Sequence, residues 1–151
     1  MTFSVKTLIL SGWTQPVDAL AHLVDNPVLF DYSDYSSPDE AIAAIAKIRP
    51  AHVVGWSMGG QLVLRAIAAG ALVPKHLTLI GVPHRFVGTD GMGEETFRLF
   101  RESYATDPVR TKTRFHGLVA KGDSRMREVI EMLGHHPNVE DVERWLPWLD
   151  N

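Results

Sequence analysis

The sequence predicts an α/β fold in which a parallel sheet is followed by a block of helices. In the first half, short apolar runs alternate with helical patterns, and strands separated by helices form parallel sheets. After Pro83 every remaining segment has a helical pattern, with no strand signal between them. Of the 151 residues, 45% are hydrophobic, which is typical of a folded globular chain.

Four apolar runs predict the strands of the sheet, over residues 5–10, 28–30, 51–56 and 76–82. Helices are predicted between them, over residues 16–24, from Pro38 to a stop at Pro50, and over residues 58–69. The second of these begins at a capping box, in which Ser37 and Glu40 are expected to cap each other's backbone amides, with Pro38 at the first helical position.

The second half is predicted to be helical over residues 94–105, 107–121, 124–134 and 139–149. Asp107 and Pro108 form a cap and first-turn pair, and Asn138 is expected to cap the last helix. Three glycines between Gly88 and Gly93 predict a hinge. We therefore expect a sheet domain over residues 1–87 and a helical domain over residues 88–151.

One motif carries chemistry, the run Gly55-Trp56-Ser57-Met58-Gly59-Gly60 between a predicted strand and a predicted helix. It matches the G-x-S-x-G pattern, in which glycines let neighbouring backbone approach a sharp turn that exposes the serine hydroxyl. The helix start adds free N–H groups and a positive dipole end. Ser57 is thus the predicted nucleophile and the Met58 N–H a predicted oxyanion donor; the alternative is a Gly-rich turn with an inert serine.

A second motif, Ser11-Gly12-Trp13, follows the first predicted strand. Such a loop could bring a second backbone N–H to the oxyanion, and we assign this N–H to Trp13. The indole of Trp13 could also line an acyl pocket. The alternative interpretation is a buried aromatic residue after a strand.

These motifs resemble the α/β-hydrolase superfamily, and within it the esterases that demethylate pimeloyl-ACP methyl ester in biotin synthesis. A third stretch shares the resemblance, Asp107-Pro-Val-Arg-Thr-Lys-Thr-Arg-Phe115 continuing to Lys121-Gly122-Asp123. The resemblance implies a parallel-sheet α/β-hydrolase core with a helical lid. It also implies a serine carboxylesterase that needs no metal and no organic cofactor.

In that family the lid carries arginines that hold the acidic acyl-carrier protein, and an aromatic residue that lines the acyl channel. The matching positions are Arg110, Arg114 and Arg127 for docking and Phe115 for the channel. Residues 96–127 carry a net charge of +5 against −8 for the rest of the chain. On a helix Lys121 returns to nearly the face of the first two arginines, making a basic stripe, although a solvated helix face would look similar.

The superfamily orders its triad as Ser, then Asp or Glu, then His, on later strands. Because helical patterns fill the sequence after residue 83, we expect the acid and histidine beyond residue 151 and the sheet to be truncated before its C-terminal strands. His84, His116 and His135 are expected to be solvated or capping residues. Two alternatives remain, another α/β-hydrolase chemistry on small esters and a non-catalytic fragment or binding half.

Composition and charge exclude several types of catalysis, metal site and partner. The absence of cysteine excludes thiolate catalysis and Cys-ligated zinc, and no secretion signal is visible, so a cytoplasmic location is expected. No apolar run approaches the roughly 20 residues of a membrane span, and the net charge of −3 gives no nucleic-acid signal. An open sheet edge predicts a dimer or pairing with the missing C-terminal part. Tyr32 and Tyr35 are interpreted as surface aromatics or substrate contacts.

Overall fold

The computed structural model of the chain describes residues 6–135 and 139–150. Internal contacts divide the chain into two compact units. The first comprises Met1–Trp13 and Val17–Val82, and the second comprises Thr14–Pro16 and Pro83–Asn151. The domain boundary expected after residue 87 stays a prediction.

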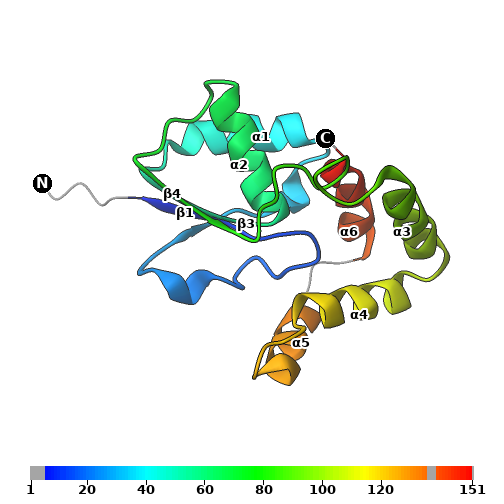
Figure 1. Cartoon of the computed structure of the whole chain (residues 1–151). Helices are drawn as coiled ribbons and strands as arrows, with labels where there is room; N and C mark the ends of the chain where they lie inside the picture. The colour runs from blue at the N-terminus through cyan, green and yellow to red at the C-terminus, as the bar shows by residue number, and fades with distance from the viewer. Residues whose placement is uncertain (1–5, 136–138, 151) are drawn as a thin grey trace, which may run out of the picture. The chain divides into compact units, whose positions relative to one another are not determined.

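The first unit is built on a parallel sheet with the order β2-β1-β3-β4 (Figure 1). Its strands are β1 (Thr7–Leu10), β2 (Val28–Leu29), β3 (His52–Trp56) and β4 (His76–Ile80). In the register of the central pair, Leu8 lies opposite Val53 and Leu10 opposite Gly55. The sheet, with helices between its strands, confirms the predicted α/β fold class.

Alternate residues of the central strands face opposite sides of the sheet, as the two-residue period of a strand requires. Ile9 and Val54 form one buried cluster with Leu20, and Trp56 packs at its margin. Leu20 comes from the segment 16–24, which the sequence predicted as a helix. That prediction is wrong, because the segment holds only turns and the short 3-10 helix η1 (Ala21–Leu23).

The physical reason is that a helix of this length is marginal in water, since its first turn is costly to nucleate. No side chain caps the start of η1. Burial of Leu20, which is 8% exposed, therefore decides the path of the segment.

Two helices of the first unit follow their sequence signals, α1 (Pro38–Ile48) and α2 (Met58–Ala68), and pack against each other (Figure 1). The Ser37 hydroxyl accepts a hydrogen bond from the Glu40 N–H at 3.2 Å, as the capping box predicted. The Glu40 carboxylate reaches one residue further back, accepting from the N–H of Ser36 at 2.9 Å and from its hydroxyl at 2.8 Å. These two bonds lower the pKa of Glu40.

Replacing Ser37 by alanine is expected to lower the free energy of unfolding by about 1 kcal/mol, because the Glu40 N–H loses its cap. The midpoint of urea unfolding measures the change. Ser103→Ala, on an exposed position within a helix, is the control and should leave the midpoint nearly unchanged. Equal midpoints for both variants would contradict the capping role.

Strand β4 lies at one edge of the described sheet. Leu77 and Leu79 on this strand remain 37% and 40% exposed. An exposed apolar edge strand is a template for association. Dimer formation, or pairing with another segment, nevertheless stays a prediction.

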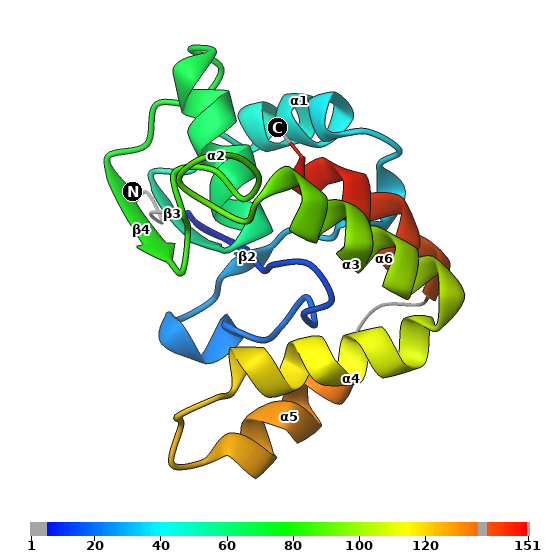
Figure 2. The same ribbon diagram turned by 45° about the vertical axis from the view of Figure 1, so that its right-hand side comes forward.

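The second unit is helical, as predicted, and its elements are α3 (Glu94–Thr106), α4 (Pro108–Val119), α5 (Met126–Gly134), α6 (Val139–Trp145) and the 3-10 helix η3 (Leu146–Leu149) (Figure 2). Helix α4 packs against both α3 and α5. The Asp107 carboxylate caps α4 by accepting from the Arg110 N–H at 3.0 Å. Lys121 lies in the turn after α4, not on the helix as expected.

The segment before α3 is a tight turn. The Gly88 N–H donates to the Met92 carbonyl at 2.9 Å, and the Met92 N–H donates to the Phe86 carbonyl at 2.7 Å. A hinge motion at these glycines stays a prediction, and the expected cap Asn138 lies outside the described residues. Over residues 6–135 and 139–150, no helix is both long enough and apolar enough to cross a bilayer.

Candidate active site

Ser57 occupies the sharp turn between the end of β3 and the start of α2. Its backbone has φ 56° and ψ −120°, a left-handed conformation that few residues other than glycine adopt. Its N–H donates to the Ile80 carbonyl at 3.0 Å, and its carbonyl accepts from the Gln61 N–H at 3.1 Å. Such strain persists only where neighbouring structure holds it, and it is common at functional sites.

The glycines around Ser57 are required by close backbone approach. A Cβ atom on Gly55 would lie 2.6 Å from the Gly60 Cα atom. A Cβ atom on Gly59 would lie 2.6 Å from the carbonyl oxygens of both Leu10 and Ser11. The predicted close approach of backbone around the serine is therefore confirmed.

The turn leaves Ser57 half-buried, whereas the Met58 side chain is buried at 1% exposure. Met58 is the first residue of α2, so its N–H belongs to the group that has no acceptor within the helix. The positive end of the helix dipole lies at the same place. This arrangement can stabilise negative charge that develops beside the Ser57 hydroxyl.

The loop after β1 runs beside the first turn of α2, because a Cβ atom on Gly59 would meet the carbonyl oxygens of Leu10 and Ser11. Trp13 in this loop is buried at 1% exposure. Burial fits the alternative interpretation of Trp13 as a buried aromatic residue. Its assignment as the second oxyanion donor stays a prediction.

Tyr32 is not the surface aromatic residue that was one of its two interpretations, and the other, a substrate contact, stays a prediction. It is 2% exposed, and its hydroxyl donates to the Ser11 carbonyl at 2.7 Å. Burial raises the pKa of this hydroxyl well above its ordinary value. Phe30 supports it with an edge-to-face contact at 5.4 Å between ring centroids, and Tyr35 stacks on Phe30 at 5.2 Å.

His116 is buried at 5% exposure, so its expected place as a solvated or capping residue is wrong. Its Nε2 atom lies 3.1 Å from the Thr14 hydroxyl, within the helical unit. No local pattern in the sequence pointed to this pair, because 102 positions separate the two residues. His84 and His135 are exposed.

The arginines matched by the resemblance lie in the helical unit. Arg110 and Arg114 are exposed and line one groove of about 420 Å³, together with residues of α3 that include Glu102. Arg127 is exposed on α5 and does not line this groove. Phe115 is half-buried, with its ring centroid 6.1 Å from that of Phe100. Their docking and channel roles stay predictions.

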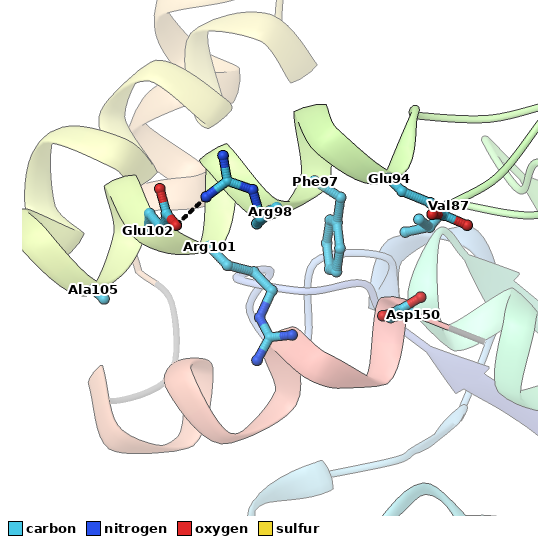
Figure 3. Close-up of a pocket in the computed structure, with 8 residues that line it drawn as sticks. All are labelled: Val87, Glu94, Phe97, Arg98, Arg101, Glu102, Ala105 and Asp150. Atoms are coloured by element: carbon cyan, nitrogen blue, oxygen red, sulfur yellow. Dashed lines mark hydrogen bonds and ion pairs between the residues drawn. The ribbon is translucent and has the colours of Figure 1, made fainter.

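A second groove, of about 490 Å³, runs along α3 beside the C-terminal residues (Figure 3). Phe97 and Arg101 line it together with Asp150. Arg98 also lines it and is paired with Glu95 at 2.6 Å and with Glu102, so its charge is locally balanced. Phe115, the expected channel residue, is not among the lining residues.

Among residues 6–135 and 139–150, no three His, Asp or Glu side chains are grouped as ligands. His136, which follows His135, lies outside the described residues.

Sequence comparison finds relatives of one kind, although no protein-family model matches the chain. The biotin biosynthesis bifunctional protein BioHC of Saccharophagus degradans is 35% identical over 94% of this chain and 31% of its own length. A pimeloyl-[acyl-carrier protein] methyl ester esterase of Methylococcus capsulatus is 34% identical over 70% of this chain and 42% of its length. Its counterpart in Xanthomonas campestris is 35% identical over 74% and 47% respectively. The chain thus spans less than half the length of these relatives.

Structural comparison agrees on the fold. The solved structure of a hydrolase from Oleispira antarctica matches 97% of this chain and 66% of its own chain, with a TM-score of 0.68 and 11% sequence identity. At this identity the likeness concerns the fold.

Proposed function

Because the chain is an α/β-hydrolase core that resembles the biotin-synthesis esterases, we propose that it forms part of a serine carboxylesterase. Its proposed substrate is the methyl ester of a pimeloyl group carried on an acyl-carrier protein. The observation that carries the proposal is the strained backbone of Ser57, at φ 56°, between a strand and a helix start. This conformation is what a nucleophile on such a turn requires.

In the proposed reaction, the Ser57 hydroxyl attacks the carbonyl carbon of the ester as its proton passes to a general base. The oxyanion accepts hydrogen bonds from the Met58 and Trp13 N–H groups. The base returns the proton as methanol leaves, and water then cleaves the acyl-enzyme to release the acid. The proposed base is a histidine oriented by an acid, in the superfamily order Ser, then Asp or Glu, then His.

The proposed partner is the acidic carrier protein. The +5 charge of residues 96–127, in a chain that is otherwise acidic, supports this choice. Arg110 and Arg114, exposed along one groove, and Arg127 on α5 are the proposed docking residues. Phe115 is the proposed channel residue.

The double variant Arg110→Glu with Arg114→Glu tests the partner in the full-length protein. We expect kcat/KM on the carrier-bound methyl ester to fall about tenfold or more, because charge reversal repels an acidic partner. The rate on a small free methyl ester should change less than about twofold, since that substrate needs no docking.

Lys47→Glu, an exposed reversal on α1, is the matched control and should leave both rates unchanged. Equal loss on both substrates would indicate a defect of the site instead of docking. Full activity of the double variant on the carrier-bound ester would contradict the proposed partner. If the full-length protein hydrolysed neither ester, the non-catalytic alternative would replace the esterase.

A further inference from the structure

The loop after β1 is buried along its length, which is uncommon for a connecting segment. Ser11, Trp13 and Thr14 are each no more than 1% exposed. Thr14 has φ 66°. For a β-branched residue this left-handed conformation is a genuine outlier, so specific contacts must hold it.

One such contact fixes the start of the loop. The Tyr32 hydroxyl donates to the Ser11 carbonyl at 2.7 Å, while the same oxygen borders the position of Gly59 in α2. The ring of Tyr32 is itself held edge-to-face by Phe30. Burial raises the pKa of this hydroxyl, which favours its protonated, hydrogen-bond-donating form.

A second contact fixes the residue that follows Trp13. His116 Nε2 lies 3.1 Å from the Thr14 hydroxyl, and both side chains are buried. A buried polar pair of this kind is costly to break, because each partner would lose its hydrogen bond away from water. The bond therefore favours the left-handed backbone conformation of Thr14.

We infer that Tyr32 and His116 are positioning residues, which hold the backbone on either side of Trp13 so that its N–H is preorganised for the oxyanion. This inference rests on the proposed function, since it gives the Trp13 N–H a role in that reaction. Each hydrogen bond lies within one compact unit, and the two residues that they hold, Ser11 and Thr14, flank Gly12 and Trp13 in the chain. A preorganised donor lowers the activation barrier without contributing to ground-state binding. Loss of either hydrogen bond should therefore lower kcat and leave KM nearly unchanged.

The test compares Tyr32→Phe and His116→Ala in the full-length protein. We expect kcat on a small free methyl ester to fall about tenfold to a hundredfold, because a misplaced N–H donor loses most of its stabilisation of the oxyanion. KM should change less than about twofold. His116→Gln keeps an amide near the Nε2 position and should recover most of kcat.

A matched control separates loss of positioning from general damage. His22→Ala removes an exposed histidine and should retain the wild-type kcat.

Amide hydrogen exchange gives a readout that does not depend on turnover. Exchange at Trp13 and Thr14 should become about tenfold faster in Tyr32→Phe and His116→Ala, and remain unchanged in β3. Thr14→Gly tolerates the positive φ, so His116→Ala should have a smaller effect in that background.

Unchanged exchange at Trp13 and Thr14, or faster exchange with wild-type kcat, would overturn the positioning role. Failure of the proposed function has a different signature, since wild-type protein would then show no hydrolysis although exchange still responded to the variants.

Discussion

Substitution of Ser57 by glycine is expected to raise the stability of the protein while it removes hydrolysis. Glycine adopts φ 56° without the strain that a side chain brings, so the free energy of unfolding should rise by about 1 kcal/mol. Loss of the nucleophile should lower kcat by about 10⁴-fold or more. Urea unfolding measures the first effect, and ester hydrolysis by the full-length protein measures the second.

Ser57→Ala separates the two effects, because alanine lacks the hydroxyl but keeps the Cβ atom. It should lose hydrolysis as fully as glycine and show none of its gain in stability. Fluorophosphonate labelling of the wild-type protein should yield one adduct at Ser57, located by mass spectrometry. An adduct that survives in Ser57→Ala would rule out this residue as the nucleophile.

Gly59→Ala is expected to lower the free energy of unfolding by about 3 kcal/mol, since overpacking against immobile atoms is costly. The added methyl group would meet the carbonyl oxygens of Leu10 and Ser11 at 2.6 Å, and neither can move without displacing β1 or the loop that follows it. The same displacement would shift the proposed oxyanion loop. Activity should therefore fall together with the urea midpoint.

Gly117→Ala is the matched control, because Gly117 lies within α4 and an added Cβ atom would meet nothing within 4 Å. It should raise the free energy of unfolding by about 0.5–1 kcal/mol, as alanine favours the helix. Destabilisation by both variants, or by neither, would mean that backbone approach at Gly59 is not the cause.

Local signals predicted most of the elements. The cap at Ser37 located α1, and Asp107 with Pro108 located α4, because a capping side chain bonds the backbone a few residues away. The strand preceding Ser57 and the helix following it came from apolar runs of the right length. The helix expected over residues 16–24 failed, since contacts of Leu20 with distant strands outweighed local helix preference.

The candidate site was predicted only in part. The glycines around Ser57 were predicted from their spacing alone, and a Cβ atom on Gly55 or on Gly59 would indeed meet neighbouring backbone. The contacts of the Trp13 loop could not be predicted from local sequence. Tyr32 is 21 residues from its partner Ser11, and His116 is 102 residues from its partner Thr14. The sequence left Tyr32 open between a surface aromatic residue and a substrate contact, and it predicted His116 to be solvated or capping.

The sequence by itself determined the parallel sheet, the helical second half and the turn that carries Ser57, since all three depend on periodicity, caps and glycine spacing. Only the tertiary structure decided that Thr14 adopts a left-handed conformation, that the Tyr32 hydroxyl bonds the Ser11 carbonyl and that His116 bonds the Thr14 hydroxyl. The physical reason is that a buried polar group must find a partner, and the folded chain offers partners that no local pattern encodes.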